Sequence, residues 1–514
     1  MKRASWAIAL AAFLTFALTG GGRITGSDEL AQLNLARVMP GRFDVPPEGS
    51  TILGADGKVY TKNTWGQAWL ALPLARAGLV AAHLGGFTGT RAELASRFVT
   101  SFFNGIVTAV LLGFAYRVMR SLRLSPGASF AATFTLGFTT PLWVSAKGFA
   151  CEPIEALGML LAIGGGALAG GDSSPKDRQR GEWWAAVGAF LAIFVKLGVT
   201  PMVIACLLSI GVRRPRAWLI PGGGVVAALA TNALYNFIRL RNVFDSGYGS
   251  QQSFEAFSTP LHVGVLGLLV SSGKGMAWFA PVMWMAPLGL MNMLGVTRMA
   301  SGPQEGIEVR RAGWSILAAW IVGVLVYGRF QHWGGDGSWG PRYLAPLLPA
   351  GAIAVGFALH GAAGLRKQIA WALATVGLLV TLGGVGIYFG AEMREVGDYP
   401  YTRALEDPKF MHESHWEPRQ SPILVSWRML SRNLGEHFRG KAPSIAPSSS
   451  EANPRTGISH DDERALLHAI DVWWLYACYA GLPGLPLAIV AILLSGASVW
   501  AWGRALGAVR EDPA

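Results

Sequence analysis

Long apolar runs alternate with short polar stretches along the whole chain. An α-helix needs roughly 20 consecutive apolar residues to cross the hydrocarbon core of a bilayer, and most of the runs approach that length. After a first run at residues 1–22, further runs lie near 91–117, 127–146, 152–170, 183–197, 199–211, 217–238, 275–296, 313–328, 343–360, 369–389 and 471–503. The pattern predicts an all-α polytopic membrane protein with about 12 transmembrane helices.

The first apolar run has two interpretations. It follows Lys2 and Arg3 and ends in glycines, which is typical both of a cleaved signal peptide and of a retained first span. The sequence Ala-Leu-Thr at residues 17–19 is a poor cleavage site. We therefore favour a retained membrane anchor.

Three other apolar segments differ from an ordinary span. The runs 183–197 and 199–211 are short, and we interpret them as tilted or broken helices. The segment 66–84 contains Pro73 and Arg76. We expect it to form a helix that lies along the membrane surface or dips into it.

The composition supports a membrane protein and excludes several other classes. Of the 514 residues, 52% are hydrophobic and 14% are charged, whereas roughly a quarter are charged in an ordinary soluble domain. This excludes a disordered tail, a coiled coil and a cytosolic enzyme of usual composition. The net charge of +12 does not predict nucleic-acid binding, because the basic residues are scattered through short loops between apolar runs.

The distribution of these basic residues predicts the topology. If the N-terminus is inside, every second loop should be rich in Lys and Arg. The predicted inner segments contain Arg117, Arg120, Arg123, Lys176, Arg178, Arg180, Arg213, Arg214, Arg216, Arg298, Arg310, Arg311, Arg366, Lys367, Arg504 and Arg510. The alternation holds along the whole chain, so both termini are predicted to be cytoplasmic.

The outer side then receives the longer polar segments. These are a first loop at about 23–90, short loops at 147–151, 239–261 and 329–342, and a polar segment of the chain at 391–470 with a flexible Pro/Ser linker at 441–457. We predict a transmembrane catalytic core over 1–390, the periplasmic segment 391–470, and a final transmembrane helix with a cytoplasmic tail over 471–514. Three cysteines give neither a disulfide framework nor a zinc spacing, and no internal repeat is evident.

Two adjacent acids, Asp28 and Glu29, follow the first span and precede an amphipathic helical pattern. A carboxylate at the water–lipid boundary is suited to accept a proton from an acceptor hydroxyl or amine. The structural alternative is a helix N-cap formed by Ser27 or Asp28. The two roles are compatible, and the sequence leaves both open.

Two outer loops carry further charged candidates. Lys62, just before a Trp-Gly pair, is suited either to bind a lipid phosphate or to extend its ammonium to the membrane surface. Lys147, Glu152 and Glu155 lie at the top of two predicted spans. An acid there either stabilises a helix N-terminus or orients a substrate.

The loop at 239–261 and the segment after it carry Tyr248 and Lys274. Residues 272–275 (Ser-Gly-Lys-Gly) faintly resemble a nucleotide phosphate loop. However, Gly275 follows the lysine where Ser or Thr is required, and Leu268 replaces the first glycine. We exclude a nucleotide site here, although Lys274 remains a candidate for a lipid phosphate.

The segment 329–350 is the densest cluster of chemically active residues. Its glycines allow a ligand to approach the backbone, its aromatic rings suit a sugar, and an arginine at the mouth of a span needs an anionic partner. The candidates are His332, Trp333, Asp336, Trp339, Arg342 and Tyr343. By contrast, the spacing of His412, Glu413 and His415 does not match a zinc-protease motif, and we expect a solvated loop there.

The order of these motifs is similar to that of a known family. Thr-Pro-Leu-Trp (140–143) and Glu-Pro (152–153) follow the acidic pair and Tyr-x-Lys (60–62); then come Tyr-Asn-x-x-Arg (235–239), Gly-Tyr (247–248), Ser-x-Gly-Lys-Gly (271–275) and Trp-Gly-Gly-x-x-Ser-x-Gly-Pro-Arg-Tyr (333–343). Residues 1–390 resemble the bacterial polyprenyl-phosphate-dependent glycosyltransferases with the C-type membrane fold, whose relatives include protein mannosyltransferases and the lipid A aminoarabinose transferase.

This resemblance implies roles for individual residues. Asp28 would be the catalytic base, with Glu29 as its neighbour or alternate. Lys62 and Arg342 would bind the donor phosphate, and Trp333 and Trp339 would border the sugar. The family's Tyr-x-x-Lys-Pro-Pro region corresponds loosely to residues 60–64, starting at Tyr60, although Asn63 and Thr64 replace the two prolines.

The implied activity is transfer of a sugar from a polyprenyl-phosphate donor to a glycan, lipid or protein acceptor at the periplasmic face of a bacterial cytoplasmic (inner) membrane. No nucleotide would be needed. A divalent cation held by Asp28 and Glu152 is left open, and no other cofactor is expected. We expect Asp28, Lys62 and Arg342 to converge in one chamber outside the cytoplasm.

Two alternatives remain at this point. A transporter or flippase for a lipid-linked sugar would use the same cations without covalent chemistry, and Lys196 within the short helices would suit it. The absent repeats and the long outer loops speak against it. A non-enzymatic envelope assembly protein with a degenerate site is the other alternative.

Overall fold

A computed structural model describes residues 2–172, 174–212, 214–296, 306–335, 337–397, 408–445 and 465–513. The candidate Asp336, the basic residues Arg213 and Arg298 and most of the predicted linker lie outside these ranges.

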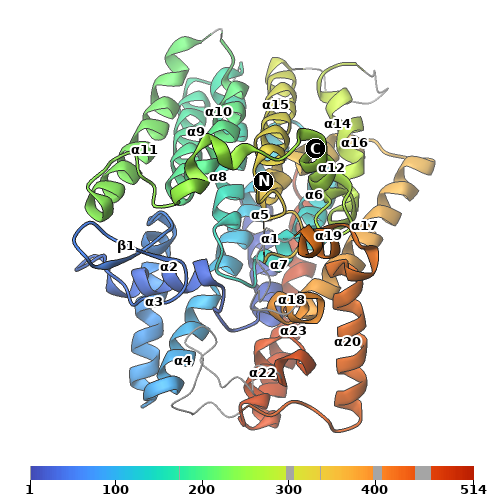
Figure 1. The fold of residues 1–514 in the computed structure, drawn as a ribbon. Coiled ribbons are helices and arrows are strands. Elements are labelled where there is room, and N and C mark those ends of the chain that lie inside the picture. Colours follow the sequence, from blue (N-terminus) through green and yellow to red (C-terminus); the bar gives the residue numbers. More distant parts are fainter. Residues whose placement is uncertain are drawn as a thin grey trace.

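The described chain is mostly helical (Figure 1). In the first half the helices are α1 (Lys2–Thr19), α2 (Ser27–Val38), α3 (Gly66–Leu84), α4 (Gly89–Ser101), α5 (Phe103–Ser121), α6 (Pro126–Phe138), α7 (Leu142–Ser145), α8 (Glu152–Gly170), α9 (Pro175–Val195), α10 (Thr200–Leu207) and α11 (Leu219–Leu240). In the second half they are α12 (Leu261–Val270), α13 (Met276–Phe279), α14 (Ala286–Met293), α15 (Ile307–Arg329), α16 (Leu348–Leu359), α17 (Gly364–Gly386), α18 (Phe389–Gly397), α19 (Pro408–Trp416), α20 (Pro422–Phe438), α22 (Trp473–Tyr479) and α23 (Gly484–Arg510).

Seven helical segments within the described ranges are long and apolar enough to cross a membrane, and the protein is accordingly an integral membrane protein. They are Gly89–Ser121, Glu152–Gly170, Pro215–Leu240, Ile307–Arg329, Arg342–Leu359, Gly364–Gly386 and Gly484–Arg510. The run near 183–197 is longer than we expected from its apolar residues, because α9 begins at Pro175, where Ser174 caps it by accepting a hydrogen bond from the Asp177 amide.

Helix α8 occupies the centre of the helical body, and its neighbours approach it closely. An added Cβ at Gly158 or Gly165 would lie 2.6 Å or less from the backbone of α9, and one at Gly188 would meet α8 in the same way. Small residues let membrane helices pack backbone to backbone. This packing fixes α8 and therefore its first residue, Glu152.

The segment 23–90, which we predicted to be the first outer loop, is folded rather than extended. After α2 the chain forms a two-stranded antiparallel sheet, β1 (Thr51–Leu53) with β2 (Val59–Thr61), in which Ile52 faces Tyr60. This hairpin is a small exception to the all-α prediction. The segment 66–84 forms one helix, α3, tied to α2 by hydrogen bonds of the Gln32 amide with Thr64 and Ala68. In Figure 1, α3 and α4 extend toward the lower end of the view, away from α9 and α11.

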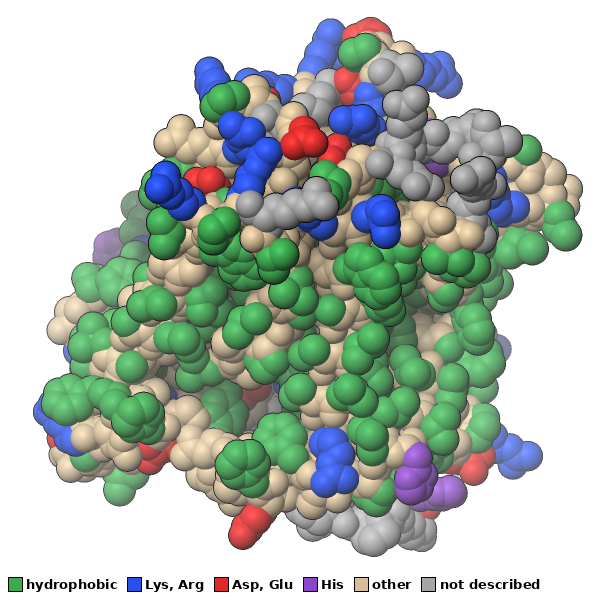
Figure 2. Space-filling model, turned by 90° about the horizontal axis from the view of Figure 1, so that it is seen from above, with side chains coloured by type: hydrophobic (Ala, Val, Ile, Leu, Met, Phe, Trp, Pro, Cys, Tyr) green, Lys and Arg blue, Asp and Glu red, His purple; other side chains and the backbone are tan. Residues whose placement is uncertain are grey.

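Ion pairs join two pairs of the segments that we predicted to lie inside the cell. Arg3 pairs with Glu511 at 3.2 Å, which brings the two termini together. Arg123 likewise pairs with Glu308 at 3.2 Å. Figure 2 shows basic side chains gathered toward one end of a face, with a broad hydrophobic band next to them. Such a band is what a lipid-facing surface requires.

Candidate active site

A cavity of about 460 Å³ lies where segments far apart in the sequence meet. Its walls come from the start of α2, the 141–152 connection, the loop before α16 and the end of α17. Of the candidates, Asp28, Glu29, Lys62, Lys147, Glu152, Tyr248, Trp339, Arg342 and Tyr343 line it. The structure thus brings nine of the predicted residues into one chamber.

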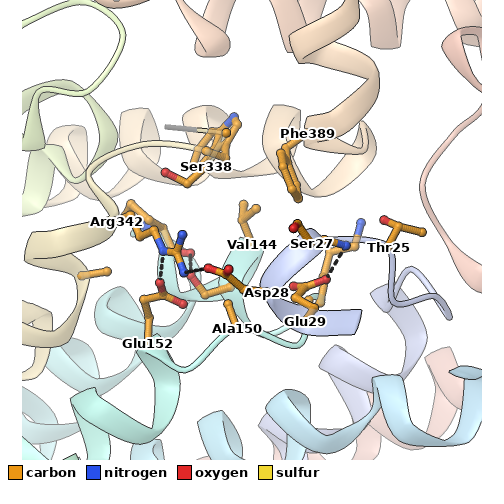
Figure 3. A pocket seen from close by; sticks show the side chains of 18 of the residues that line it. Thr25, Ser27, Asp28, Glu29, Val144, Ala150, Glu152, Ser338, Arg342 and Phe389 are labelled. Carbon is orange, nitrogen blue, oxygen red and sulfur yellow. Dashed lines mark hydrogen bonds and ion pairs between the residues drawn. The ribbon is translucent and has the colours of Figure 1, made fainter. Parts of the chain in front are cut away.

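One arginine binds two carboxylates in this cavity. Arg342 Nη2 lies 3.3 Å from Asp28 Oδ2, and Arg342 Nε donates a hydrogen bond to Glu152 Oε1 (Figure 3). We call these three residues the Arg342 cluster. It joins α2 to α8 and to the loop before α16, so an arginine at the mouth of a span receives the anions that it needs.

Local sequence positions each member of the Arg342 cluster. Glu152 is the first residue of α8, where the helix dipole favours an anion. Arg342 follows Gly335 and Gly340, whose φ angles of +73° and +76° allow the two tight turns of this loop. Asp28 lies in the first turn of α2, whose N-cap is Gly26. The expected N-cap at Ser27 or Asp28 is therefore wrong, and Asp28 is free to face the cavity.

The two carboxylates differ in accessibility. The side chain of Asp28 is 41% exposed, whereas that of Glu152 is 3% exposed. Burial in the cavity alone would raise the pKa of Asp28, but Arg342 together with hydrogen bonds from Ser50 and Asn63 holds it below its ordinary value. Asp28 is therefore an ionised carboxylate that a ligand in the cavity can reach.

Glu29 is occupied by the backbone. One of its oxygens accepts a hydrogen bond from the Phe149 amide at 2.7 Å, and the other accepts one from the Gly26 amide at 3.1 Å. Burial outweighs these bonds and raises the pKa of Glu29. Glu29 thus links the backbone at Phe149 to the backbone at Gly26 and caps α2. Its role is therefore different from that of Asp28, whose carboxylate faces the cavity.

Lys62 contributes a cation without a carboxylate partner. Its Nζ donates to Gln251 Oε1 at 3.1 Å and lies 4.7 Å from the centre of the Tyr248 ring. Tyr248 in turn donates its hydroxyl hydrogen to Asn63 Oδ1 at 2.5 Å. Within the described ranges Lys62 forms no ion pair, so its ammonium keeps donors for a ligand in the cavity.

A second charged cluster lies in the wall of the same cavity. Asp471 pairs with Lys147 at 3.0 Å and with Arg23. All three side chains are less than a tenth exposed. We call Arg23, Lys147 and Asp471 the Arg23 cluster. It joins the segment after α1 and the 141–152 connection to the segment before α22.

Other predicted residues lie outside the cavity wall. Tyr60 donates to Asp56 at 2.8 Å in the β-hairpin, and Trp333 packs edge-on against His415. His332 is buried beside Phe330. Lys274 does not line the cavity itself. Its Nζ donates a hydrogen bond at 2.5 Å to the backbone oxygen of Ser338, which does line it.

The aromatic candidates that do line the cavity are held by other rings. Tyr343 stacks on Tyr327 with a centroid distance of 4.4 Å, and Trp339 contacts Phe279 edge-on at 4.8 Å. Each therefore presents a fixed surface to the cavity. Fixed aromatic faces suit the apolar faces of a sugar ring.

Arg23 and Asp471 are cavity residues that we did not identify from the sequence. Each is a charged residue beside an apolar run, and that position is the signal that could have found them. Beneath the cavity, Lys196 lies 3.8 Å from Glu155, which is fully buried. The lysine in the short helices thus belongs to a charged layer that continues the site into the helical body.

The carboxylates do not fit a divalent cation well. A metal held by Asp28 and Glu152 would have to occupy the position of the Arg342 guanidinium, which already bonds both. In the described part of the chain no group of three or more His, Cys, Asp or Glu side chains is placed to hold a metal. Arg342 supplies the positive charge between the carboxylates, and we derive no step through a metal.

Comparison with known proteins gives a limited result. No protein-family model matches the chain, and no curated protein matches it significantly. Two solved structures are similar: ArnT from Cupriavidus metallidurans bound to undecaprenyl phosphate (TM-score 0.46) and the same protein in the apo state (TM-score 0.45). Each is 14% identical, and each alignment covers 98% of this chain and 75% of the other. We draw nothing about function from a likeness at this level.

Proposed function

We propose that this protein is a membrane glycosyltransferase that moves a sugar from a polyprenyl-phosphate donor to an envelope acceptor. The observation that carries the proposal is the meeting of Asp28, Lys62 and Arg342 in one cavity. An accessible carboxylate beside two cations provides both of the groups that such a transfer needs. A base is required at the acceptor, and positive charge is required at the departing phosphate.

The proposed step is a displacement at the anomeric carbon. An acceptor hydroxyl or amine attacks that carbon and gives its proton to Asp28. The bond between the carbon and the phosphate oxygen breaks, and its electron pair leaves with the polyprenyl phosphate. The phosphate changes from a diester to a monoester and gains negative charge, which preorganised cations stabilise most strongly.

The cations have different parts in this step. Lys62 forms no ion pair in the described ranges, so it is the first contact for the donor phosphate. Arg342 uses Nε and Nη2 for the carboxylates, which leaves Nη1 for the phosphate oxygen as charge develops. Arg342 also fixes the orientation of Asp28. The rings of Trp339 and Tyr343 border the space for the sugar.

The membrane arrangement is part of the proposal. We propose about 12 crossings, with the cavity on the periplasmic side of a bacterial cytoplasmic membrane and both termini inside. The helices α1, α6, α9, α10 and α13–α14 would supply the five crossings beyond the seven long segments. The segments 1–390, 391–470 and 471–514 remain the proposed division into catalytic core, periplasmic segment and final span.

A complementation experiment tests the function. Envelope glycans of a deletion strain carrying the wild-type chain or Asp28→Asn are compared by mass spectrometry, with Asp56→Asn as the control for a loop aspartate outside the cavity. We expect one glycan modification to return with the wild type and Asp56→Asn but not with Asp28→Asn. A flippase would retain its function in Asp28→Asn, so full activity of that variant would contradict the proposal.

A further inference from the structure

Arg23 is a buried arginine with unused hydrogen-bond donors. The residue is 7% exposed and lines the cavity, and its Nη2 donates to Asp471. Among the residues that the structure describes, its Nε and Nη1 have no hydrogen-bond partner. A buried donor without a partner is destabilising, and more so when it is charged. The oxygens of an anion bound in the cavity would satisfy these donors.

The Arg23 cluster also carries an excess positive charge. Lys147 donates to both the backbone and the side chain of Asp471 and to the backbone oxygen of Val385, so its ammonium is fully used. Asp471 is a single carboxylate between two cations. The cluster therefore has a net charge of about +1, and Arg23 is the member with donors left for a ligand.

Aromatic residues hold Arg23 in position and add another donor. The guanidinium carbon lies 4.2 Å from the centre of the Tyr388 ring and 5.1 Å from that of Tyr476, which restricts its movement. Trp339 also lies in the cavity wall and is 6% exposed, and its indole N–H has no partner in the described part of the chain. Two buried side chains from distant segments thus present unused N–H groups.

The position of Arg23 in the cavity differs from that of the site proposed for the donor phosphate. In Figure 3, Asp28 lies between Arg342 on one side and Thr25 on the other. Thr25 is hydrogen-bonded to Tyr388, on which Arg23 stacks. In this view Arg342 and Thr25 lie on opposite sides of Asp28, and Arg23 is linked to the Thr25 side through Tyr388. A molecule whose hydroxyl or amine meets Asp28 could extend its far end toward Arg23.

We infer that Arg23 is the anion-binding residue of an acceptor subsite, and that the acceptor carries a phosphate or carboxylate group near the atom that receives the sugar. The identification of the bound molecule as the acceptor rests on the proposed function. The anion-binding site itself does not depend on catalysis. Arg23 is a specificity-determining residue in this account, because a neutral acceptor would leave its donors unsatisfied.

The test is a binding titration with short amphiphiles on the purified full-length protein in a neutral detergent. Octyl phosphate is the anionic probe, octyl glucoside is the neutral one, and undecaprenyl phosphate at saturating concentration occupies the donor side. We expect octyl phosphate to bind in the presence of undecaprenyl phosphate. We expect Arg23→Gln to weaken this binding about tenfold or more, as for a lost charged hydrogen bond.

Matched variants separate the two phosphate sources and a merely structural role. Lys62→Gln should weaken the binding of undecaprenyl phosphate and leave the affinity for octyl phosphate within about twofold. Arg23→Gln should instead weaken the binding of octyl phosphate and leave that of undecaprenyl phosphate nearly unchanged. Arg37→Gln, which breaks a partly buried pair between Arg37 of α2 and Glu93 of α4, should change neither. If Arg23→Gln does not fold, Arg23→Lys keeps the charge but loses the planar fork, and we expect a loss of about threefold or more.

Three results would overturn the inference. They are unchanged octyl phosphate binding in the Arg23 variants, displacement of octyl phosphate by undecaprenyl phosphate, and equal binding of octyl glucoside. Failure of the proposed function would look different. In that case undecaprenyl phosphate would not bind, or transfer would survive Asp28→Asn. Octyl phosphate would still bind, and its binding would still be weakened in the Arg23 variants.

Discussion

The two charged clusters of the cavity are built from the same residue types with opposite balance. In the Arg342 cluster one cation serves two carboxylates, and the carboxylate of Asp28 is 41% exposed. In the Arg23 cluster two cations serve one carboxylate, and Asp471 is 9% exposed. The difference teaches which acid can react. A base must be reached by its substrate, and among these acids only Asp28 combines exposure with an excess of negative charge around it.

The largest expected effect on the difference between the two clusters comes from Asp28. Asp28→Asn keeps the shape of the side chain but removes the base, so we expect transfer to fall about 10²- to 10⁴-fold, the usual contribution of general base catalysis. The measurement is transfer by the reconstituted protein. Donor binding should change little, and Asp56→Asn should behave as the wild type. A loss below tenfold in Asp28→Asn would assign the proton to another group.

Arg342→Gln tests the claim that one guanidinium holds both carboxylates. Removing it leaves Glu152 buried without a counter-ion, and breaking a buried pair costs about 3–5 kcal/mol. We expect a lower apparent melting temperature together with lost transfer. The double variant Arg342→Gln with Glu152→Gln should recover stability without recovering transfer. Equal stability of the single variant and the wild type would mean that the pair does not support the fold.

Lys62→Gln tests the cation without a carboxylate partner. We expect the KM for the donor to rise about tenfold or more, since a charged hydrogen bond to phosphate contributes about 1.5–3 kcal/mol. The effect on kcat should be smaller. Lys58→Gln, on the exposed part of the same hairpin, is the control. A fall in kcat at unchanged KM would place Lys62 away from the ground-state phosphate.

Lys147→Met tests the structural half of the Arg23 cluster. It removes an ammonium whose donors are all used, while Arg23 still pairs with Asp471. We expect a loss of stability of about 1–3 kcal/mol and transfer within about threefold per folded molecule. A tenfold loss of transfer at an unchanged melting temperature would instead show that Lys147 contacts substrate.

The smallest expected effect is on the pH profile. Because the pKa of Asp28 is lowered, its carboxylate stays ionised as the pH falls below the ordinary aspartate value of about 3.9. The stability from its pairing is present above the unfolded-state pKa and is lost as the pH falls through the folded pKa. The acid limb of kcat/KM of the wild type should therefore lie below the ordinary aspartate pKa of about 3.9. An acid limb above that value would show that Arg342 does not lower the pKa of Asp28.

The sequence predicted the helices better than the pairing of charges. Apolar runs depend on nearby residues, so the runs at 152–170 and 313–328 correspond to α8 and α15. The need of Arg342 for an anion could be stated from its position at a span. Its partner could not, because Asp28 is 314 residues away and no local pattern links the two.

The Arg23 cluster shows the same limit more strongly. Arg23 and Asp471 are 448 residues apart, and each alone is an ordinary charged residue at the end of an apolar run. The sequence also could not tell which tryptophan would face the cavity. Trp333 and Trp339 share one motif, yet Trp339 lines the chamber and Trp333 packs against His415. Loop turns at Gly335 and Gly340 decide that difference.

The most direct test of the account is a structure of this protein with undecaprenyl phosphate bound. The central claim is that the lipid phosphate and the reactive carboxylate share one cavity. We predict the phosphate within hydrogen-bond distance of Lys62 Nζ, on the Arg342 side of the chamber, with Asp28 facing the space next to it. A phosphate bound outside this chamber, for example beside Arg3 and Glu511, would contradict the account.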